Sequence, residues 1–196
     1  NAWSYEDYSH LVRGSVKGKF NPTHWLQYIT IESGLANRRP LVVLGVQVKP
    51  GSGTFAYNKN GGAAGLFQAM PAIQRNLGFR GEDFRELSCQ EQMTYSFKYL
   101  EEWRLRYKLP SWDRAGDLYL TNFWPAGLKH KDEPGWVIAK QGGTVYRVNA
   151  GLDHDRKGCI NVLDMSVSAN KALNYGVFKV AEKSLVAVAQ RALKVK

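Results

Sequence analysis

The spacing of apolar residues along this chain is mainly that of α-helices. From Pro22 to Ser33 apolar side chains recur every three or four residues, the period of a helix with one buried face. The segment is preceded by Asn21, a residue type that caps helix starts, and Pro22 is favoured in the first turn. Gly34 marks the expected end of this helix.

Four further segments carry helical signals, and they run over 71–78, 88–107, 112–124 and 177–196. The second opens with Ser88 and Glu91 at the spacing of a capping box, in which each side chain bonds the backbone N–H of the other residue. The third stops at Pro125, which cannot continue a helix. The last is basic and amphipathic. We expect it to pack on the core, the alternative being insertion into an anionic lipid or outer-membrane surface.

Short β elements interrupt the helical pattern. Residues 41–48 are apolar and β-branched and predict a strand, followed by a turn at 49–53. Residues 137–139 and 144–148 flank a Gly-Gly pair, which predicts a hairpin. The predicted fold class is therefore mainly α with small β-hairpins. We expect a single α-rich domain over 1–196, in which 166–196 is a C-terminal helical extension packed on the rest.

The composition indicates a folded chain. Of its 196 residues 44% are hydrophobic and 12% aromatic. This excludes a disordered protein, because enough apolar surface is present to offset the entropy of ordering. No segment approaches the ~18 consecutive apolar residues of a membrane span. Cys89 and Cys159 lack the spacing of a metal site, and we expect two free thiols, with one disulfide as the alternative.

The formal net charge of +10 indicates an anionic partner or a role in solubility. Nucleic acid, an anionic membrane and an acidic polymer such as a bacterial cell wall all fit this charge. The sequence contains no zinc-finger, RNA-recognition or basic-region motif, so we expect no nucleic-acid partner. The charge alone does not choose between the remaining two.

Glu32 is the residue that points to chemistry. It falls on the apolar face of the first predicted helix, beside Trp25 and Tyr28. Packing of that face would remove water from the carboxyl group and raise its pKa, which is what a general acid needs near neutral pH. The alternative is a partly exposed glutamate in the last turn of a helix.

A second candidate is the stretch 61–71, in which small residues give way to apolar ones before a predicted helix. Small residues let a backbone approach a ligand closely, and Gln68 offers a donor and an acceptor to a sugar amide or hydroxyl. The alternative is a tight loop that serves only to start the next helix.

These motifs together resemble the soluble lytic transglycosylase family of the lysozyme superfamily, in its bacteriophage lysin branch. Glu32-Ser33-Gly34 is similar to the Glu-Ser pair at a helix end in that family. Gly65-Leu66-Phe67-Gln68 with Met70-Pro71 is similar to its Gly-Leu-Met/Phe-Gln stretch. Asp117-Leu118-Tyr119-Leu120 with Pro125-Ala126 resembles its later tyrosine-bearing helix, although the family's Ala-Tyr-Asn form is absent. The resemblance covers about residues 22–126.

The resemblance implies an α+β lysozyme-like fold and one catalytic acid/base, Glu32. Ser33 would help to orient the carboxylate or the substrate acyl group, and Tyr119 would hydrogen-bond near Glu32. The substrate-binding residues that it implies are Ser33, Gly65, Phe67, Gln68 and Tyr119. Phe67 stands where many members have Met and would offer an apolar contact to a sugar face.

The implied reaction cleaves the MurNAc-β-1,4-GlcNAc bond of peptidoglycan and leaves a 1,6-anhydroMurNAc end. A hydrolytic muramidase would instead use water positioned by a second carboxylate, for which Glu6, Asp7 and Asp117 are candidates. A catalytically inactive cell-wall-binding virion module is a further alternative. The resemblance implies action in the bacterial periplasm or cell wall, as a phage virion or lysis protein, on peptidoglycan and the anionic envelope, as a monomer without a cofactor.

Residues 153–164 match a twelve-residue EF-hand loop in several positions. Oxygen ligands fall at Asp153, Asp155, Asn161 and Asp164, and glycine stands at the turn position. Lys157, however, occupies a ligand position. Two interpretations follow: the loop binds calcium, or the Lys157 ammonium pairs with the aspartates in place of a metal.

Overall fold

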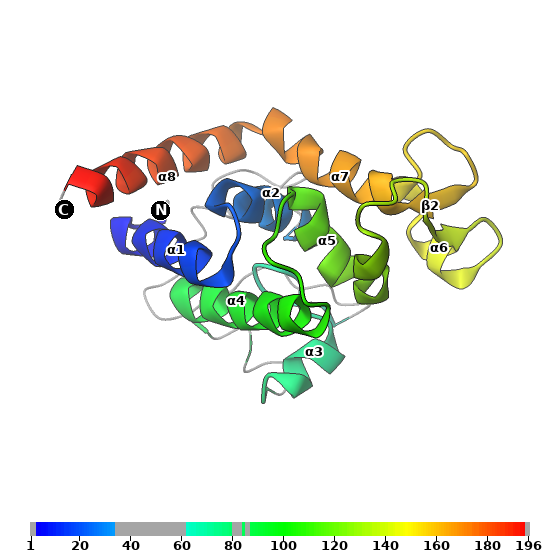
Figure 1. The fold of residues 1–196 in the computed structure, drawn as a ribbon, viewed down its shortest axis with the longest axis horizontal. Coiled ribbons are helices and arrows are strands. Elements are labelled where there is room, and N and C mark those ends of the chain that lie inside the picture. The colour runs from blue at the N-terminus through cyan, green and yellow to red at the C-terminus, as the bar shows by residue number, and fades with distance from the viewer. Residues whose placement is uncertain (1–2, 34–61, 80–83, 85–86, 195–196) are drawn as a thin grey trace.

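The computed structural model describes residues 3–33, 62–79, 84 and 87–194. The strand expected at 41–48 and the turn expected at 49–53 lie outside these residues, as does Gly34. Helices dominate the part that is described, which confirms the mainly α class (Figure 1).

The elements follow one another as a series of helices with one small sheet. The α-helices are α1 (Tyr5–Gly18), α2 (Pro22–Glu32), α3 (Pro71–Asn76), α4 (Cys89–Arg106), α5 (Ala115–Phe123), α6 (Thr144–Val148), α7 (Val162–Asn170) and α8 (Gly176–Lys194). The short 3₁₀ helices are η4 (Pro125–His130), η5 (Ala150–Leu152) and η6 (Lys171–Asn174), and the strands are β1 (Val137–Lys140) and β2 (Cys159–Asn161).

The helix starts follow the capping signals of the sequence. The Asn21 side chain accepts the Thr23 N–H at 2.8 Å at the start of α2. Ser88 and Glu91 form the predicted capping box of α4. Helix α5 begins at Ala115, three residues later than predicted, because the backbone near residue 112 is extended and bridges to the segment after α1.

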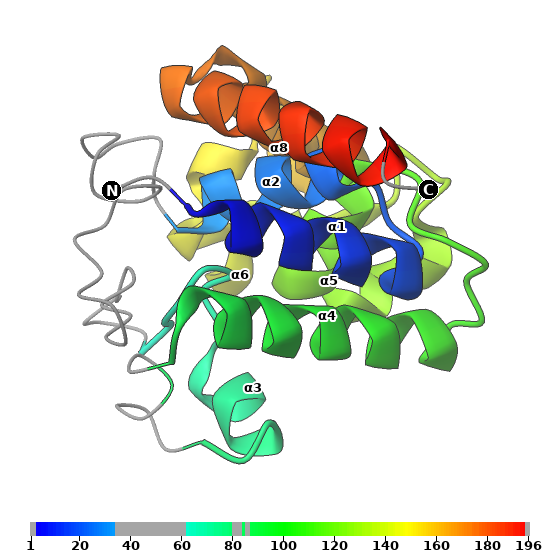
Figure 2. The same ribbon diagram turned by 90° about the vertical axis from the view of Figure 1, so that its left-hand side faces the viewer.

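Helix α2 lies at the centre of the described helices, and its residues from Trp25 to Thr30 are all buried (Figure 1). It packs against α1, α5, α7 and α8, and α4 packs in turn on α1 and α5. In Figure 2, α8, α1 and α4 form successive layers. This arrangement places the end of α2, with Glu32, between α4 and α5. The apolar side chains between these layers form one core cluster whose largest fully buried members are Trp25, Tyr28, Phe67, Phe84 and Phe178.

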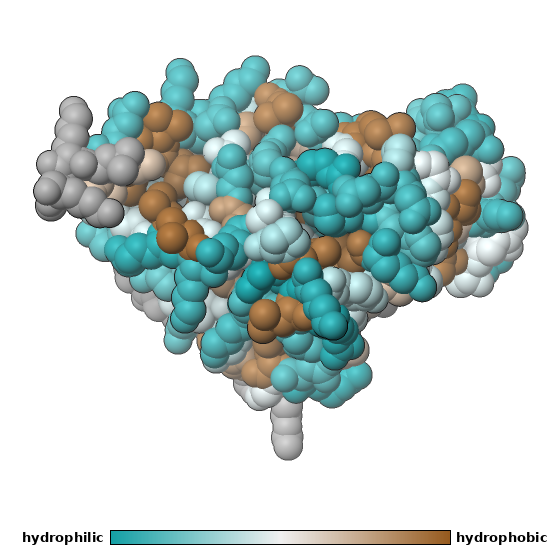
Figure 3. Space-filling view, viewed as in Figure 1, coloured by the Kyte–Doolittle hydropathy of each residue, from teal (hydrophilic) through white to brown (hydrophobic). Residues whose placement is uncertain are grey.

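The basic C-terminal helix packs on the rest of the molecule. The apolar side of α8 is buried at Phe178, Ala181, Leu185 and Val188, which confirms that this amphipathic helix packs on the core. Ala192, near the end of the same side, is exposed. None of the helices in the described ranges has the length and apolar character that a membrane crossing requires. The face in Figure 3 is mainly hydrophilic, with apolar residues reaching the surface in small areas.

The predicted hairpin is wrong in its second half. Residues 144–148 form helix α6, and β1 pairs with β2 in an antiparallel arrangement in which Ala139 lies opposite Ile160. Ile160 is fully buried, whereas Val148 is 71% exposed. The strand pairing therefore follows the burial of Ile160 and not the β-branched character of residues 144–148.

Candidate active site

Glu32 is the last residue of α2 and is half-buried. Burial raises the pKa of its carboxyl group to about 8, and a hydrogen bond from the Asn122 side chain offsets part of that rise. The carboxyl group therefore holds its proton at neutral pH, the state that a general acid needs. This agrees with the raised pKa expected from the apolar face of the helix.

Three tyrosines from three different helices lie within electrostatic reach of this carboxyl group. Burial is the first cause of the raised pKa values of Tyr28, Tyr99 and Tyr119, and the negative charge of Glu32 raises each of them further. All three phenols are therefore neutral at physiological pH, and that of Tyr99 donates its proton to the Thr121 carbonyl at 3.0 Å. Helix packing thus brings Tyr119 near Glu32, from α5 and α2 respectively.

Asn122 joins this group from the same helix as Tyr119, one turn further on. Its Nδ2 donates to the carbonyl oxygen of Phe67 at 3.0 Å. Its Oδ1 is buried and has no hydrogen-bond partner among the described residues, and the same holds for the hydroxyl of Tyr28. Buried polar atoms are normally partnered, so these two atoms are exceptions that lie near Glu32.

The stretch 62–70 is a tight loop fixed by buried glutamines. The Gln92 Oε1 accepts the Leu66 N–H at 2.9 Å, and the Gln74 Nε2 donates to the carbonyls of Gly62 and Ala69 at 2.9 and 2.6 Å. These bonds replace the secondary structure that the loop lacks. They hold the backbone beside α5 in one conformation.

Gly65 is required by this loop. Its φ is +82°, and a Cβ at this position would lie 2.6 Å from Gln92 Oε1 and 2.7 Å from the Phe84 ring. The residue is buried, so in this structure it faces the protein interior. Its role in a glycan groove stays a prediction, and what the structure shows is the course of the loop that the glycine permits.

Phe67 and Gln68 follow Gly65 in the same loop. Phe67 is fully buried, with its ring against Phe84 and Tyr99 at centroid distances of 5.8 and 5.9 Å. It therefore packs in the core, and its ring is closed to the sugar contact that we expected. Gln68 is half-buried with a φ of +48°, and its Nε2 donates to the Gly65 carbonyl at 3.0 Å.

Ser33 is buried at the end of α2, next to Glu32. Its hydroxyl donates to the carbonyl of Ile29 in the preceding turn. The hydroxyl thus ties off the last turn of the helix. It fixes the backbone that carries Glu32 and makes no hydrogen bond to the carboxyl group among the described contacts.

A pocket of about 210 Å³ opens beside this group of residues. Tyr99 and Asn122, both close to Glu32, line it together with the Trp103 side chain. The remaining lining residues are Ala72, Ile73, Asn76, Leu77, Glu102 and Pro125. The lining is mainly apolar with two amide side chains, as is usual for small-ligand sites, and Glu32 itself is not among the lining residues.

The three carboxylates considered as a second catalytic group are placed elsewhere. Glu6 is exposed in the first turn of α1. Asp7 caps the same helix through Ser4 and accepts from Gln90 at 3.1 Å. Asp117 is buried, which raises its pKa, and Arg114 pairs with it at 2.9 Å and lowers it in part. In the described part of the chain none of them contributes to the pKa shift of Glu32.

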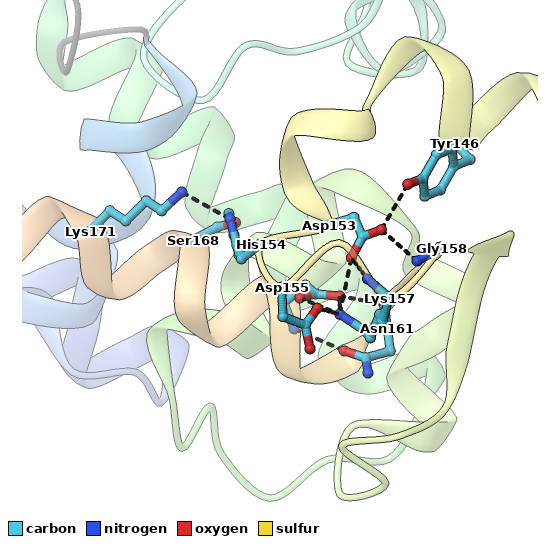
Figure 4. Close-up of polar contacts among 10 residues, drawn as sticks. Tyr146, Asp153, His154, Asp155, Lys157, Gly158, Asn161, Ser168 and Lys171 are labelled. Atoms are coloured by element: carbon cyan, nitrogen blue, oxygen red, sulfur yellow. Dashed lines mark hydrogen bonds and ion pairs between the residues drawn. The ribbon is translucent and has the colours of Figure 1, made fainter. Parts of the chain in front are cut away.

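The EF-hand-like loop contains a lysine at its centre (Figure 4). The Nζ of Lys157 lies 2.6 Å from Asp155, 2.9 Å from both carboxylate oxygens of Asp164 and 3.5 Å from Asp153. Asp164 also accepts the N–H of Asn161 and so caps α7. The structure thus supports the interpretation in which the ammonium pairs with the aspartates. No group of three or more His, Cys, Asp or Glu side chains in the described ranges is arranged to hold a metal ion.

The charged groups of this loop shift the pKa values of Asp153 and Lys157. Burial by itself would raise the pKa of Asp153, but bonds from the Tyr146 hydroxyl and two backbone N–H groups, with the Lys157 charge, lower it to about 2. The pKa of Lys157 is raised above its usual range by its bonds to Asp155 and Asp164, against the opposing effect of burial. Asp153 and Lys157 are therefore both ionised at neutral pH.

The sequence interpretation missed several residues of the site. Asn122 follows Tyr119 by three positions, and residues three apart lie on the same side of a helix. Its proximity to Glu32 could therefore have been inferred. Helix α4 carries Gln92, Tyr99 and Trp103 at helical spacing along one side. Only the tertiary packing turns this side of the helix toward α2 and the loop.

Comparisons of this chain with protein-family models, with curated proteins and with solved structures find no match. The functional argument therefore rests on the residues of the site and on the motifs in the sequence.

Proposed function

We propose that this chain is a lytic transglycosylase that cleaves the MurNAc-β-1,4-GlcNAc bond of peptidoglycan, on a lysozyme-like fold. The observation that carries the proposal is the carboxyl group of Glu32, which burial keeps protonated with a pKa of about 8. The motif resemblance associates Tyr119 and the 62–70 loop with such a glutamate. Tyr119 lies within electrostatic reach of Glu32. Asn122 connects the loop to Glu32, because its side chain bonds both the carboxyl group and the Phe67 carbonyl.

One carboxyl group suffices for this reaction. Protonated Glu32 gives its proton to the glycosidic oxygen as the bond to MurNAc C1 breaks. The resulting carboxylate takes the proton of the MurNAc C6 hydroxyl, whose oxygen attacks C1 and closes the 1,6-anhydro ring. The proton lost in the first step is regained in the second. A pKa near neutrality lets the same group act in both directions.

The neighbours of Glu32 fit these two steps. The neutral phenols of Tyr28 and Tyr119 can donate to the carboxylate after it has lost its proton, while the Tyr99 hydroxyl donates to the Thr121 carbonyl at 3.0 Å. The unpartnered Asn122 Oδ1 can accept from a sugar hydroxyl or acetamido N–H. The pocket with the Trp103 side chain offers an apolar face to a sugar ring.

Hydrolysis by a muramidase is the second candidate, and one observation favours it. Glu102 lines the same pocket as Tyr99 and Asn122, and its side chain is 58% exposed. A carboxylate on this side could hold a water molecule for attack on C1. Its ion pair with Arg106 at 3.3 Å competes with that role.

The charge of +10 fits the proposed setting, since bacterial envelopes are anionic. We place the activity in the bacterial periplasm or cell wall, in a phage virion or lysis protein.

Product analysis on purified peptidoglycan tests the proposal. The wild-type chain should release muropeptides that end in 1,6-anhydroMurNAc, and the Glu32→Gln variant should release none. Glu133→Gln is the control, because Glu133 is an exposed glutamate that bonds His130 on η4. Reducing MurNAc ends would assign hydrolysis instead. Cleavage retained by Glu32→Gln would overturn both enzymes, and wild-type binding without cleavage would leave a cell-wall-binding module.

A further inference from the structure

A larger groove lies on another side of α4, between this helix and α1. Its volume is about 500 Å³, within the range of about 300–1,000 Å³ usual for small-ligand sites. It is lined from α1 by His10, Arg13, Gly14, Lys17 and Gly18, and from α4 by Thr94, Phe97, Lys98, Glu101 and Glu102. Both helices face the viewer in Figure 2. Phe97 lies about half a helical turn from Tyr99, so the two cavities open on different sides of α4, and Glu102 lines both of them.

The floor of the groove is apolar and firmly packed. A Cβ on Gly14 would collide with the Phe97 ring, so the glycine is what lets this ring lie against α1. The Phe97 ring also contacts Phe20 and Trp25, at centroid distances of 5.3 and 5.5 Å. Because the ring is held on these sides, the apolar floor does not depend on a bound ligand.

The polar groups within the groove bond one another. His10 Nε2 and Thr94 Oγ1 are 2.8 Å apart, and Thr94 also donates to the Gln90 carbonyl. A neutral sugar or peptide would find few unpartnered hydrogen-bonding groups here. The groove therefore favours a ligand whose inner part is apolar.

The rim carries positive charge that its acidic neighbours do not neutralise. Arg13, Lys17 and Lys98 are exposed, and none forms an ion pair within the described part of the chain. Glu101 bonds Arg104 at 2.8 Å through two nitrogens, and Glu102 pairs with Arg106. These two acids are thus paired with arginines of their own helix. The Lys98 ammonium lies over the Tyr95 ring at 5.0 Å, so Arg13 and Lys17 are the rim cations left to meet an anion.

We propose that this groove binds a long-chain fatty acid. The acyl chain would lie along the Phe97 ring between α1 and α4, and the carboxylate would meet Arg13 and Lys17 at the rim. Burial of the methylene groups favours binding, and a charge-assisted bond fixes the orientation. An apolar floor beside a cationic rim fits a ligand that has both an apolar chain and an anionic head.

Titration calorimetry with laurate below its micelle concentration tests this proposal on the full chain. The wild type should bind laurate and should not bind dodecylamine, which has the same chain length and the opposite charge. The Arg13→Gln/Lys17→Gln double variant should bind laurate about tenfold or more weakly, the loss expected for charged hydrogen bonds. These side chains are exposed, so the variant should fold.

The matched control is Lys179→Gln/Lys183→Gln, which removes the same charge from the exposed side of α8. It should bind laurate as the wild type does. No binding of laurate by the wild type would overturn the proposal, as would equal binding of dodecylamine. Equal loss in the two double variants would show a general charge effect and no site. Since Glu32 takes no part, the outcome is independent of the proposed enzyme activity.

Discussion

The side chain of Asn122 hydrogen-bonds the carboxyl group of Glu32 while its Nδ2 holds the carbonyl of Phe67 at 3.0 Å. One residue of α5 thus connects the proposed acid at the end of α2 with the loop 62–70. Burial and this hydrogen bond act in opposite directions on the pKa of Glu32, and burial is the larger effect.

The raised pKa of Glu32 has a consequence for stability. In the unfolded chain the group ionises near its ordinary value of 4.5, and in the folded chain near 8. Between these values the folded state binds the additional proton, so stability falls as pH rises through this window. Glu32→Gln has no such titration and should gain stability relative to the wild type by about 2–4 kcal/mol between roughly pH 5 and pH 8.

Urea unfolding at the two pH values measures this difference. The Glu133→Gln control should show no comparable gain, because Glu133 is exposed. A pH-independent gap between Glu32→Gln and the wild type would contradict a buried, protonated carboxyl group.

Removal of the Asn122 amide should move the pH profile of cleavage. The hydrogen bond from Asn122 lowers the pKa of Glu32, so Asn122→Ala should raise it further. The limb at which activity declines with rising pH should then shift upward, by about half a unit to one unit, while the maximal rate falls.

Asn76→Ala is the matched control for this variant. Asn76 lines the same pocket but does not contribute to the pKa of Glu32. It should change the KM for glycan fragments and leave the limb in place. A downward shift in Asn122→Ala would show that the amide does not stabilise the ionised form.

Alanine substitutions at two glycines with similar positive φ distinguish backbone strain from steric collision. Gly65 has a φ of +82° and Gly78 a φ of +89°, but only at Gly65 would a Cβ meet other atoms, at 2.6 Å. Gly78→Ala should therefore cost about 1–2 kcal/mol, and Gly65→Ala about 2–5 kcal/mol. Each kcal/mol corresponds to about 2–4 °C in Tm for a chain of this size, so thermal unfolding distinguishes the two. Equal losses would mean that Gln92 gives way to the new methyl group.

The helices were predictable from the sequence wherever a cap and an apolar stripe coincide. Asn21 and Ser88 mark the starts of α2 and α4, and Phe178 and Leu185 belong to a stripe that is buried in α8. Helix α1 was not predicted. Its local signals were nevertheless present, because Ser4 and Asp7 form a capping box and the buried residues Tyr8, Leu11, Ser15 and Gly18 recur every three or four positions.

The elements that were predicted wrongly depend on distant contacts. Residues 144–148 have strand-like composition but form α6, because β1 finds its partner in Ile160, on the EF-hand-like loop. Glu32 was found from its own helix, since the apolar face near it is local. The contributions of Tyr99 and Asn122 required the packing of α4 and α5 around that helix, which no local pattern contains.

We expect removal of the Lys157 ammonium to destabilise the fold at neutral pH and to destabilise it less in acid. Lys157→Met removes the ammonium and leaves Asp153, Asp155 and Asp164 facing one another, which should cost about 1–3 kcal/mol at neutral pH. In the wild type the pKa of Asp153 is depressed to about 2, so the stability it contributes is present above its ordinary value of 3.8 and is lost as pH falls toward 2. In the variant Asp153 loses the Lys157 charge that helps to lower its pKa, so it takes up its proton at higher pH than in the wild type. The gap between the two Tm values should therefore be widest near neutral pH and should narrow on acidification toward about pH 4.

Lys179→Met, on the exposed side of α8, should show neither the loss nor its pH dependence. A gap that stays constant with pH would indicate lost packing of the lysine stem and not unbalanced aspartates.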